Sequence, residues 1–167
     1  MIKTIIFDVD GTLTDGGIIF SDRGQEIKRF SAYDGLVMKV LPQIGIDTII
    51  LTGRESEIVR QRGEGLGITR IFQGVLDKEA KLREMSSDIN LEEAAYIGDD
   101  LNDYAAMLLC GCRACPANAA EEIKSICEYI SSYSGGNGAV RDILEYILKK
   151  QRQWDEILKI FKIRGEF

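Results

Sequence analysis

Short apolar runs alternate with amphipathic stretches along the whole chain, and this alternation limits the folds open to it. The apolar runs predict buried strands at 4–7, 48–51, 71–72, 94–97, 113–115 and 128–130. The amphipathic stretches predict helices at 35–44, 55–66, 78–85, 103–109 and 120–127. Strands and helices that alternate in this way are typical of a doubly wound α/β fold, in which helices cover both faces of a parallel sheet.

Two segments lie outside the alternation. Residues 18–20 and 26–30 flank a polar turn that contains Gly24, so we expect a β-hairpin flap over about 16–30. A helical tail is expected over about 139–167, with its helix beginning near Ala139 and capable of a break before Phe161. Neither of the gaps 16–30 and 56–77 can hold a separate cap domain. We therefore expect one domain over 1–167, with Asp34 capping its first helix.

The composition excludes several functional classes. The 167 residues contain no histidine, which rules out catalytic triads, metal sites and proton shuttles built on imidazole. The net charge of −6 disfavours binding to a nucleic-acid backbone. No apolar run reaches the ~18 residues of a membrane span, and carboxylates interrupt the N-terminal apolar segment, so we expect neither a membrane partner nor export from the cytoplasm.

Three of the four cysteines form a Cys-x-Cys-x-x-Cys pattern that allows a zinc site as an alternative. They are Cys110, Cys112 and Cys115, with Cys127 further on. The sequence offers no second cysteine pair and no histidine to complete four ligands. The favoured interpretation is therefore four small thiols packed in a reducing compartment.

Charged and polar residues follow four of the predicted strands directly. Because the carboxyl ends of parallel strands meet at one edge of the sheet, these side chains should share one rim. Asp8 and Asp10, two residues apart, point the same way along extended backbone, so their carboxylates repel unless a cation lies between them. The rim residues are Asp8, Asp10, Thr52, Gly53, Arg54, Lys78, Asp99, Asp100 and Asp103.

This set of groups indicates magnesium-assisted phosphoryl transfer. Carboxylate oxygens suit Mg²⁺, a hard cation, and an aspartate can attack phosphorus to form an aspartyl-phosphate. The cation would screen the anionic nucleophile from the anionic substrate. Thr52 and nearby backbone amides can hold the phosphoryl oxygens, and Lys78 adds positive charge.

The segments Asp8-Val9-Asp10-Gly11-Thr12, Thr52-Gly53, Lys78 and Gly98-Asp99-Asp100-x-x-Asp103 resemble the four motifs of the haloacid dehalogenase superfamily phosphatases. The resemblance implies a Rossmann-like fold, Asp8 as nucleophile and Asp10 as general acid and then base. It implies that Mg²⁺ is held by the Asp8 carboxylate, the Asp10 backbone carbonyl and Asp99. Asp100 and Asp103 would hold the metal-binding and nucleophilic residues in position. Thr52, Gly53 and Lys78 would bind phosphate.

Further segments resemble the branch of this superfamily that acts on 3-deoxy-D-manno-octulosonate 8-phosphate (KDO 8-phosphate), in lipopolysaccharide biosynthesis. They include Leu13-Thr14-Asp15-Gly16, Thr52-Gly53-Arg54 and Gly135-Gly136-Asn137-Gly138. Arg54 is placed to bind the sugar-acid carboxylate. The alternative substrate is a nonulosonate 9-phosphate. In the branch that acts on it, we expect Glu at the position of Arg54 and Lys near Gly65; this sequence has the Arg and lacks the Lys, which favours the octulosonate. Thr12, often Val in the octulosonate branch, is a departure that leaves the chemistry unchanged.

The hairpin carries more apolar surface than a lone two-stranded flap can stably expose to water. Its apolar residues are Ile18, Ile19, Phe20, Ile27 and Phe30. We expect a homo-oligomer in which neighbours cover each open rim, and the resemblance implies a tetramer. The tail, with Trp154, Ile157 and Phe161, is a second candidate lid or interface.

Two other classes of protein remain open at this point. A phospho-acceptor signalling module also uses aspartates, a threonine and a lysine on a doubly wound sheet. Asp10 argues against it, because a second carboxylate two residues after the nucleophile can activate water and hydrolyse the acyl phosphate. An accessory module of sugar-nucleotide synthesis would not need every motif intact. Phosphate release with and without EDTA separates the three classes.

Overall fold

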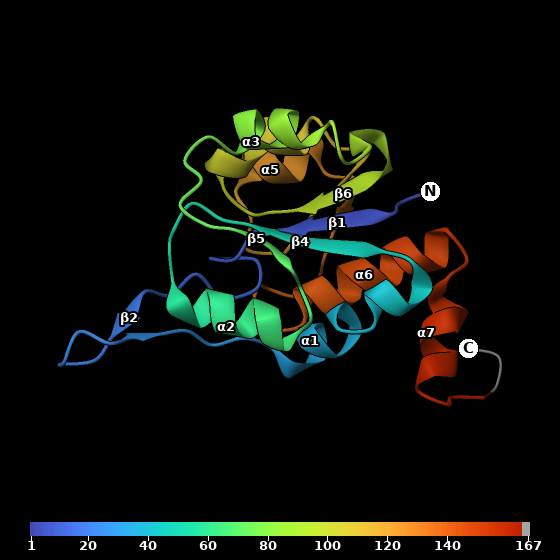
Figure 1. The fold of residues 1–167 in the computed structure, drawn as a ribbon, viewed down its shortest axis with the longest axis horizontal. Helices are drawn as coiled ribbons and strands as arrows, with labels where there is room; N and C mark the ends of the chain where they lie inside the picture. The colour runs from blue at the N-terminus through green and yellow to red at the C-terminus, as the bar shows by residue number, and fades with distance from the viewer. Residues whose placement is uncertain (165–167) are drawn as a thin grey trace.

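The computed structural model describes residues 1–164 and has a six-stranded, wholly parallel sheet at its centre (Figure 1). The strand order is β5-β4-β1-β6-β7-β8. The strands are β1 (Thr4–Phe7), β4 (Asp47–Leu51), β5 (Arg70–Phe72), β6 (Ala94–Ile97), β7 (Cys112–Cys115) and β8 (Tyr129–Ile130). The doubly wound α/β fold is confirmed. The central strands β1 and β6 are fully buried apolar runs of the kind parallel sheets require, and the edge strands β5 and β8 are only partly buried.

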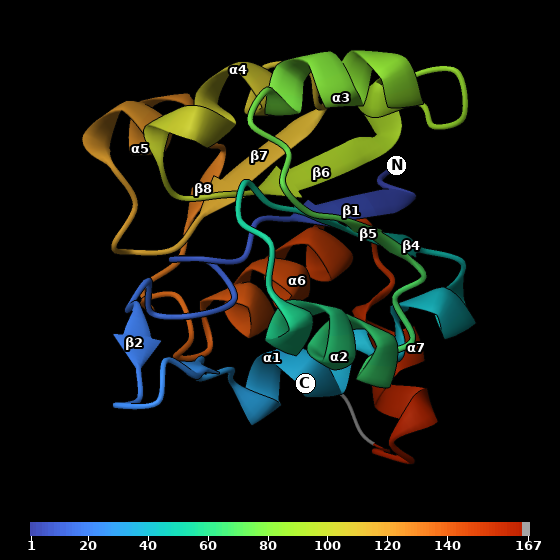
Figure 2. The same ribbon diagram turned by 60° about the vertical axis from the view of Figure 1, so that its left-hand side comes forward.

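Helices cover both faces of this sheet, as Figures 1 and 2 show. One face carries α3 (Lys78–Met85), α4 (Tyr104–Met107) and α5 (Glu121–Ile126). The other carries α1 (Ala32–Met38), α2 (Glu57–Gly65) and α6 (Ala139–Lys150). The side chains of β1 alternate between two cores: Ile5 and Phe7 pack with α1, α2 and α6, and Ile6 packs with α3 and α4. Short 3-10 helices occupy Leu41–Ile44, Leu91–Glu93 and Leu101–Asp103.

The first helix differs from its prediction at both ends. Ser31, rather than Asp34, is the N-cap, and its hydroxyl accepts a hydrogen bond from the Asp34 N–H. The Asp34 carboxylate instead accepts from the Arg141 N–H at 2.8 Å and so joins α1 to α6. The helix stops at Met38, and a separate 3-10 helix follows with Pro42 in its first turn, where no N–H is needed.

The hairpin of β2 (Ile19–Phe20) and β3 (Glu26–Ile27) projects beyond the carboxyl ends of the sheet strands (Figure 1). Its apolar side chains are exposed in this single chain, at Ile18, Ile19, Phe20 and Ile27. The hairpin and the rim therefore lie at the same end of the molecule.

The C-terminal tail folds onto its own domain. Trp154 and Ile157, which we expected at a lid or interface, are buried within the same chain instead, so that expectation is wrong for these two residues. Its second helix, α7 (Trp154–Ile160), follows a break at Arg152, whose φ is +59°. Trp154 and Ile157 are buried in the core beside α6. Helix α7 lies at the end of the molecule opposite the hairpin (Figure 1). Among the described residues, no helix is long and apolar enough to span a membrane.

Candidate active site

Three carboxylates meet where β1 and β6 end. These strands are neighbours, with Phe7 opposite Ile97, so the residues that follow them emerge together. Asp8 follows β1, Asp99 follows β6, and Asp103 lies one turn further on. One oxygen from each carboxylate lies within 4.8 Å of the others, and Asp8 and Asp103 are buried. The structure thus brings together three of the aspartates that the sequence placed on one rim.

Lys78 lies between two of these carboxylates. Asp77 caps α3 by accepting from the Ala80 N–H, which sets Lys78 at the first turn, facing the rim. The buried Lys78 Nζ donates to Asp8 Oδ1 at 2.7 Å and to Asp103 Oδ1 at 2.6 Å. Burial alone would lower the pKa of Lys78, but the charges of Asp8 and Asp103 outweigh it and raise the pKa above its usual value. Lys78 is therefore a fixed positive charge beside the Asp8 carboxylate.

Both Asp103 oxygens are fully used by protein donors. Oδ1 accepts from Lys78 and from the Tyr96 hydroxyl at 2.8 Å, and Oδ2 accepts from the backbone N–H groups of Asp99 and Asp100. A carboxylate engaged in this way orients its neighbours and has no lone pair aimed at a cation. The Asp100 side chain likewise accepts from the Leu101 N–H at 2.8 Å and starts the 3-10 helix.

Asp8 and Asp99 are the carboxylates suited to a cation. Burial raises the pKa of both, and the charge of Asp103 adds to the rise. Two ionised carboxylates this close need a compensating positive charge beyond Lys78. A Cβ on Gly11 would lie 2.0 Å from Asp99 Oδ2, so the backbone here leaves room for that carboxylate. Clustered oxygens of this kind fit Mg²⁺.

Asp10 faces the hairpin. Its Oδ1 accepts from Lys28 Nζ, and its Oδ2 lies 3.9 Å from Arg54 Nε. The Arg54 guanidinium donates to Glu26 Oε1 at 3.0 Å, so a hairpin carboxylate holds the residue that the sequence assigned to substrate. The sequence analysis missed Lys28. Strand alternation places Lys28 on the same side as Glu26 and opposite Ile27, but it does not say which of the two sides faces the rim.

The remaining rim residues lie at the end of β4. Thr52 is buried, and its backbone is held by hydrogen bonds with Phe72 and Val75. A Cβ on Gly53 would meet its nearest atom at 3.7 Å, an ordinary contact, so steric crowding does not require glycine there. Both residues lie on the rim, within the loop between β4 and α2.

The loop after β1 is supported from the far end of the chain. Asn118 Nδ2 donates to the Gly11 carbonyl at 3.0 Å, and Asn118 Oδ1 accepts from the Gly135 N–H at 2.6 Å. A Cβ on Gly135 would lie 2.0 Å from the Gly11 carbonyl oxygen, so only glycine allows this approach. Asn118 was missed at the sequence level because it follows a strand without any charged neighbour to mark it.

Comparison with known proteins identifies the family. A model of haloacid dehalogenase-like hydrolases matches residues 64–144. The curated 3-deoxy-D-manno-octulosonate 8-phosphate phosphatase KdsC of Haemophilus influenzae is 39% identical over 152 residues, which cover 90% of this chain and 84% of that protein. The chain belongs to the haloacid dehalogenase-like hydrolases. The Escherichia coli K12 phosphatase KdsC is 34% identical over 157 residues, 93% of this chain and 84% of that protein.

A solved structure supports the assignment of the chain to the hydrolase family. The crystal structure of 3-deoxy-D-manno-octulosonate 8-phosphate phosphatase from Moraxella catarrhalis, in complex with magnesium ion, phosphate ion and KDO, superposes with a TM-score of 0.91. The two sequences are 42% identical, and the match covers 96% of this chain and 93% of the Moraxella chain. These matches make the chain a phosphoric monoester hydrolase.

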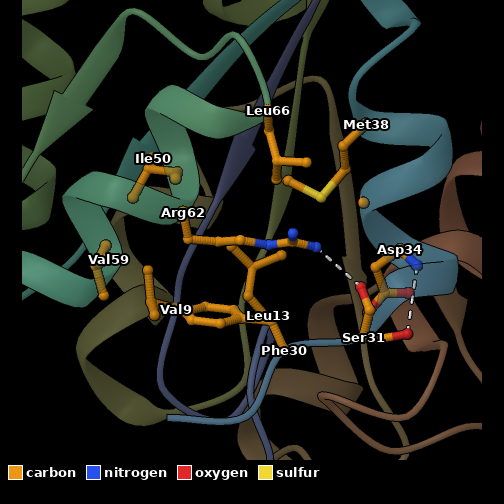
Figure 3. Close-up of a pocket in the computed structure, with 11 residues that line it drawn as sticks. Val9, Leu13, Phe30, Ser31, Asp34, Met38, Ile50, Val59, Arg62 and Leu66 are labelled. Carbon is orange, nitrogen blue, oxygen red and sulfur yellow. Dashed lines mark hydrogen bonds between the residues drawn. The ribbon is translucent and has the colours of Figure 1, made fainter. Parts of the chain in front are cut away.

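The hydrolase also contains a small cavity of about 10 Å³ beside the loop that follows β1 (Figure 3). Val9, Leu13, Phe30, Asp34 and Arg62 are among the residues that line it. This volume holds about one water molecule. It is too small for a sugar phosphate.

Asp34 makes this cavity sensitive to pH. Burial raises the pKa of Asp34 to about 6, although the Arg141 N–H and the charges of Arg62 and Arg141 lower it. Among the described residues, nothing donates a hydrogen bond to Asp34 Oδ2. Between pH 4 and 6, Asp34 therefore keeps its proton in the folded protein but loses it in the unfolded chain. The contribution of Asp34 to the free energy of unfolding falls as the pH rises through this range.

Asp34→Asn should therefore stabilise the hydrolase at neutral pH. The expected gain at pH 7 is at most about 3 kcal/mol, because two pKa units correspond to that amount, and it should disappear at pH 4. Thermal unfolding of both proteins from pH 4 to 8 measures the difference. Asp88→Asn, at an exposed site, is the control. A gain that does not change with pH would contradict the assignment.

Proposed function

We propose that this hydrolase is a Mg²⁺-dependent phosphatase of 3-deoxy-D-manno-octulosonate 8-phosphate, working through an aspartyl-phosphate intermediate. The observation that supports it most is the likeness, at 42% identity over 96% of the chain, to a phosphatase crystallised with magnesium, phosphate and KDO. The curated relatives named above also act on the eight-carbon sugar acid. This favours the octulosonate over the nonulosonate substrate and over an accessory role.

In the proposed mechanism, Asp8 attacks phosphorus and the bond to the sugar oxygen breaks. Asp10 gives a proton to that leaving oxygen and later takes one from the water that hydrolyses the aspartyl-phosphate. Lys78, 2.7 Å from Asp8 Oδ1, keeps the nucleophile oriented and offers positive charge to the phosphoryl group. Thr52 and the Gly53 backbone hold the remaining oxygens of the phosphoryl group.

Mg²⁺ would be held by the carboxylates of Asp8 and Asp99 and by the backbone carbonyl of Asp10. When bound, it offsets the negative charge of the nucleophile and of the transferring phosphoryl group. Asp103 and Asp100 hold the loop that carries Asp99, through the hydrogen bonds described above.

Phosphate release from a panel of substrates tests the proposed function. The panel contains octulosonate 8-phosphate, a nonulosonate 9-phosphate, a hexose 6-phosphate and p-nitrophenyl phosphate, each with Mg²⁺ and with EDTA. The octulosonate should have the highest kcat/KM, and EDTA should remove turnover of every substrate. Equal kcat/KM values across the panel would refute the substrate, and full activity in EDTA would refute the metal.

Arg54 provides a prediction about selectivity. We propose that the substrate carboxylate replaces Glu26 on the Arg54 guanidinium, which is 42% exposed at the rim. Arg54→Ala should lower kcat/KM for the octulosonate about 10- to 100-fold, since a charged hydrogen bond is worth roughly 1.5–3 kcal/mol, and should change p-nitrophenyl phosphate turnover little. Arg60→Ala, on the exposed side of α2, is the matched control. Equal losses on both substrates would reject the assignment.

We also propose that the enzyme is a homo-oligomer, a tetramer by likeness, in the cytoplasm, where its four free thiols stay reduced. The exposed apolar hairpin favours burial against another copy. Phe20→Asp combined with Ile27→Asp should dissociate the assembly in light scattering and lower kcat/KM for the sugar acid. A fully active wild-type monomer would contradict this proposal.

A further inference from the structure

The hairpin presents one polar side to the rim. Ile27 points to solvent, whereas Glu26 and Lys28, its neighbours, reach inward. The Lys28 side chain is only 1% exposed, although it comes from a flap two strands wide. A lysine ammonium is rarely buried without partners, because its desolvation must be compensated. Its surroundings therefore indicate what the hairpin is built to hold.

The partners of Lys28 are two carboxylates with different attachments. Its Nζ donates to Asp10 Oδ1 and lies 3.4 Å from Glu26 Oε1. Glu26 is fixed in turn, because its Oε2 accepts from the Ser56 hydroxyl at 2.6 Å and its Oε1 accepts from Arg54 at 3.0 Å. Glu26 thus ties Lys28 to the loop after β4, and Lys28 is the group that reaches Asp10 directly.

This contact leaves the two Asp10 oxygens in different states. Oδ1 is hydrogen-bonded to Lys28, and Oδ2 has Arg54 Nε 3.9 Å away, beyond hydrogen-bonding distance. The last torsion of an aspartate rotates over a broad range when nothing restrains it. A restrained carboxyl keeps one chosen oxygen toward the reacting atoms, and proton transfer requires such alignment.

We propose that Lys28 is a positioning residue that orients the Asp10 carboxyl for proton transfer to the leaving oxygen, so that the hairpin contributes to catalysis as well as to covering the rim. This inference rests on the proposed phosphatase reaction and on the role of Asp10 in it. It does not depend on which sugar is the substrate.

The leaving group distinguishes this role from simple support of the hairpin. A sugar alkoxide is strongly basic and departs only when it is protonated, so its release needs a well-placed Asp10. p-Nitrophenolate is a weak base and departs without a proton. In the first step, a residue that acts through Asp10 therefore matters for alkyl phosphates and little for p-nitrophenyl phosphate. The second step, in which Asp10 activates water, is common to both substrates, so the comparison uses the first release of nitrophenolate.

The experiment compares Lys28→Met with wild type on two substrates: the best alkyl sugar phosphate that the wild type hydrolyses, and p-nitrophenyl phosphate. We expect kcat for the sugar phosphate to fall at least about 10-fold with KM within about 3-fold. We expect the initial, pre-steady-state rate of nitrophenolate release to stay within about 3-fold. Lys39→Met is the control, because Lys39 is an exposed lysine at the C-terminal end of α1. Turnover by the wild type tests the proposed function separately.

Three outcomes would overturn the inference. Equal losses in the sugar phosphate kcat and in the initial rate of nitrophenolate release would mean that Lys28 serves the fold or the phosphoryl group. A change confined to KM for the sugar phosphate would mean that Lys28 binds substrate. A further kcat loss when Lys28→Met is added to Asp10→Asn would mean that Lys28 does not act through Asp10.

The ratio of the two rates remains informative if the variant is partly unfolded. Both substrates are measured on the same preparation, so inactive protein lowers both rates equally and leaves the ratio unchanged. If Lys28→Met yields no soluble protein, Lys28→Gln keeps a polar side chain at this position, and the same ratio and the same limits apply.

Discussion

Asp8→Asn is expected to reduce kcat to less than about one per cent of the wild-type value, because an amide cannot form the aspartyl-phosphate and losing a nucleophile costs several kcal/mol of transition-state stabilisation. The fold should be retained. Burial raises the pKa of the Asp8 carboxyl, so a neutral side chain of the same shape suits its site. Phosphate release measured over hours, with circular dichroism and thermal unfolding on the same samples, provides both readouts.

Asp15→Asn is the matched control for this variant. Asp15 lies in the same loop but is exposed, and its Oδ1 accepts from the Gly17 N–H, which an asparagine oxygen can also do. It should keep near wild-type activity. If Asp8→Asn retained more than about one per cent of activity, covalent catalysis by Asp8 would have to be abandoned, and direct attack by water would be the better account.

Asp10→Asn is expected to lower kcat by about 10²–10⁴-fold while KM changes little, since general acid–base steps are worth that much. The backbone carbonyl of residue 10 remains in place, so Mg²⁺ affinity should be unchanged in calorimetry. With p-nitrophenyl phosphate, the variant should release a burst of one nitrophenolate per active site and then stall, because the asparagine cannot activate the water of the second step.

A matched substitution for Asp10 lies at the hairpin tip. Asp22→Asn changes the same chemical group at an exposed site of the same flap and should leave kcat unchanged. A loss for Asp10→Asn that is confined to KM would show that Asp10 binds substrate and does not transfer protons. A steady rate without a burst would show that its base role is unnecessary.

The central strands were predictable because a strand buried on both faces is apolar at nearly every position. Thr4–Phe7 and Ala94–Ile97 have the same bounds in the structure as in the sequence-based prediction. Their carboxyl ends face one edge, so the convergence of Asp8 and Asp99 followed from topology alone.

Contacts between distant segments were less predictable. The strands of the hairpin are two residues long, too short for periodicity to say which side faces the rim, and Lys28 was missed for that reason. The apolar face of α7 indicates that something covers it, but a sequence does not state whether the cover is α6 of the same chain or another molecule. Pro42 split the predicted helix at 35–44 because a 3-10 turn suits it better.

The support that Asn118 and Gly135 give to the Gly11 carbonyl has a consequence for folding during synthesis. The loop that carries Asp8 leaves the ribosome before the segments that support it: its sheet neighbour β6 is made about ninety residues later, and Gly135 later still. Contacts between segments this far apart form slowly, and early strands stay unpaired meanwhile. A nascent chain stopped before Gly135 would contain every rim aspartate yet lack the support for their loop, so catalytic competence should emerge abruptly, only after Gly135 has left the ribosome.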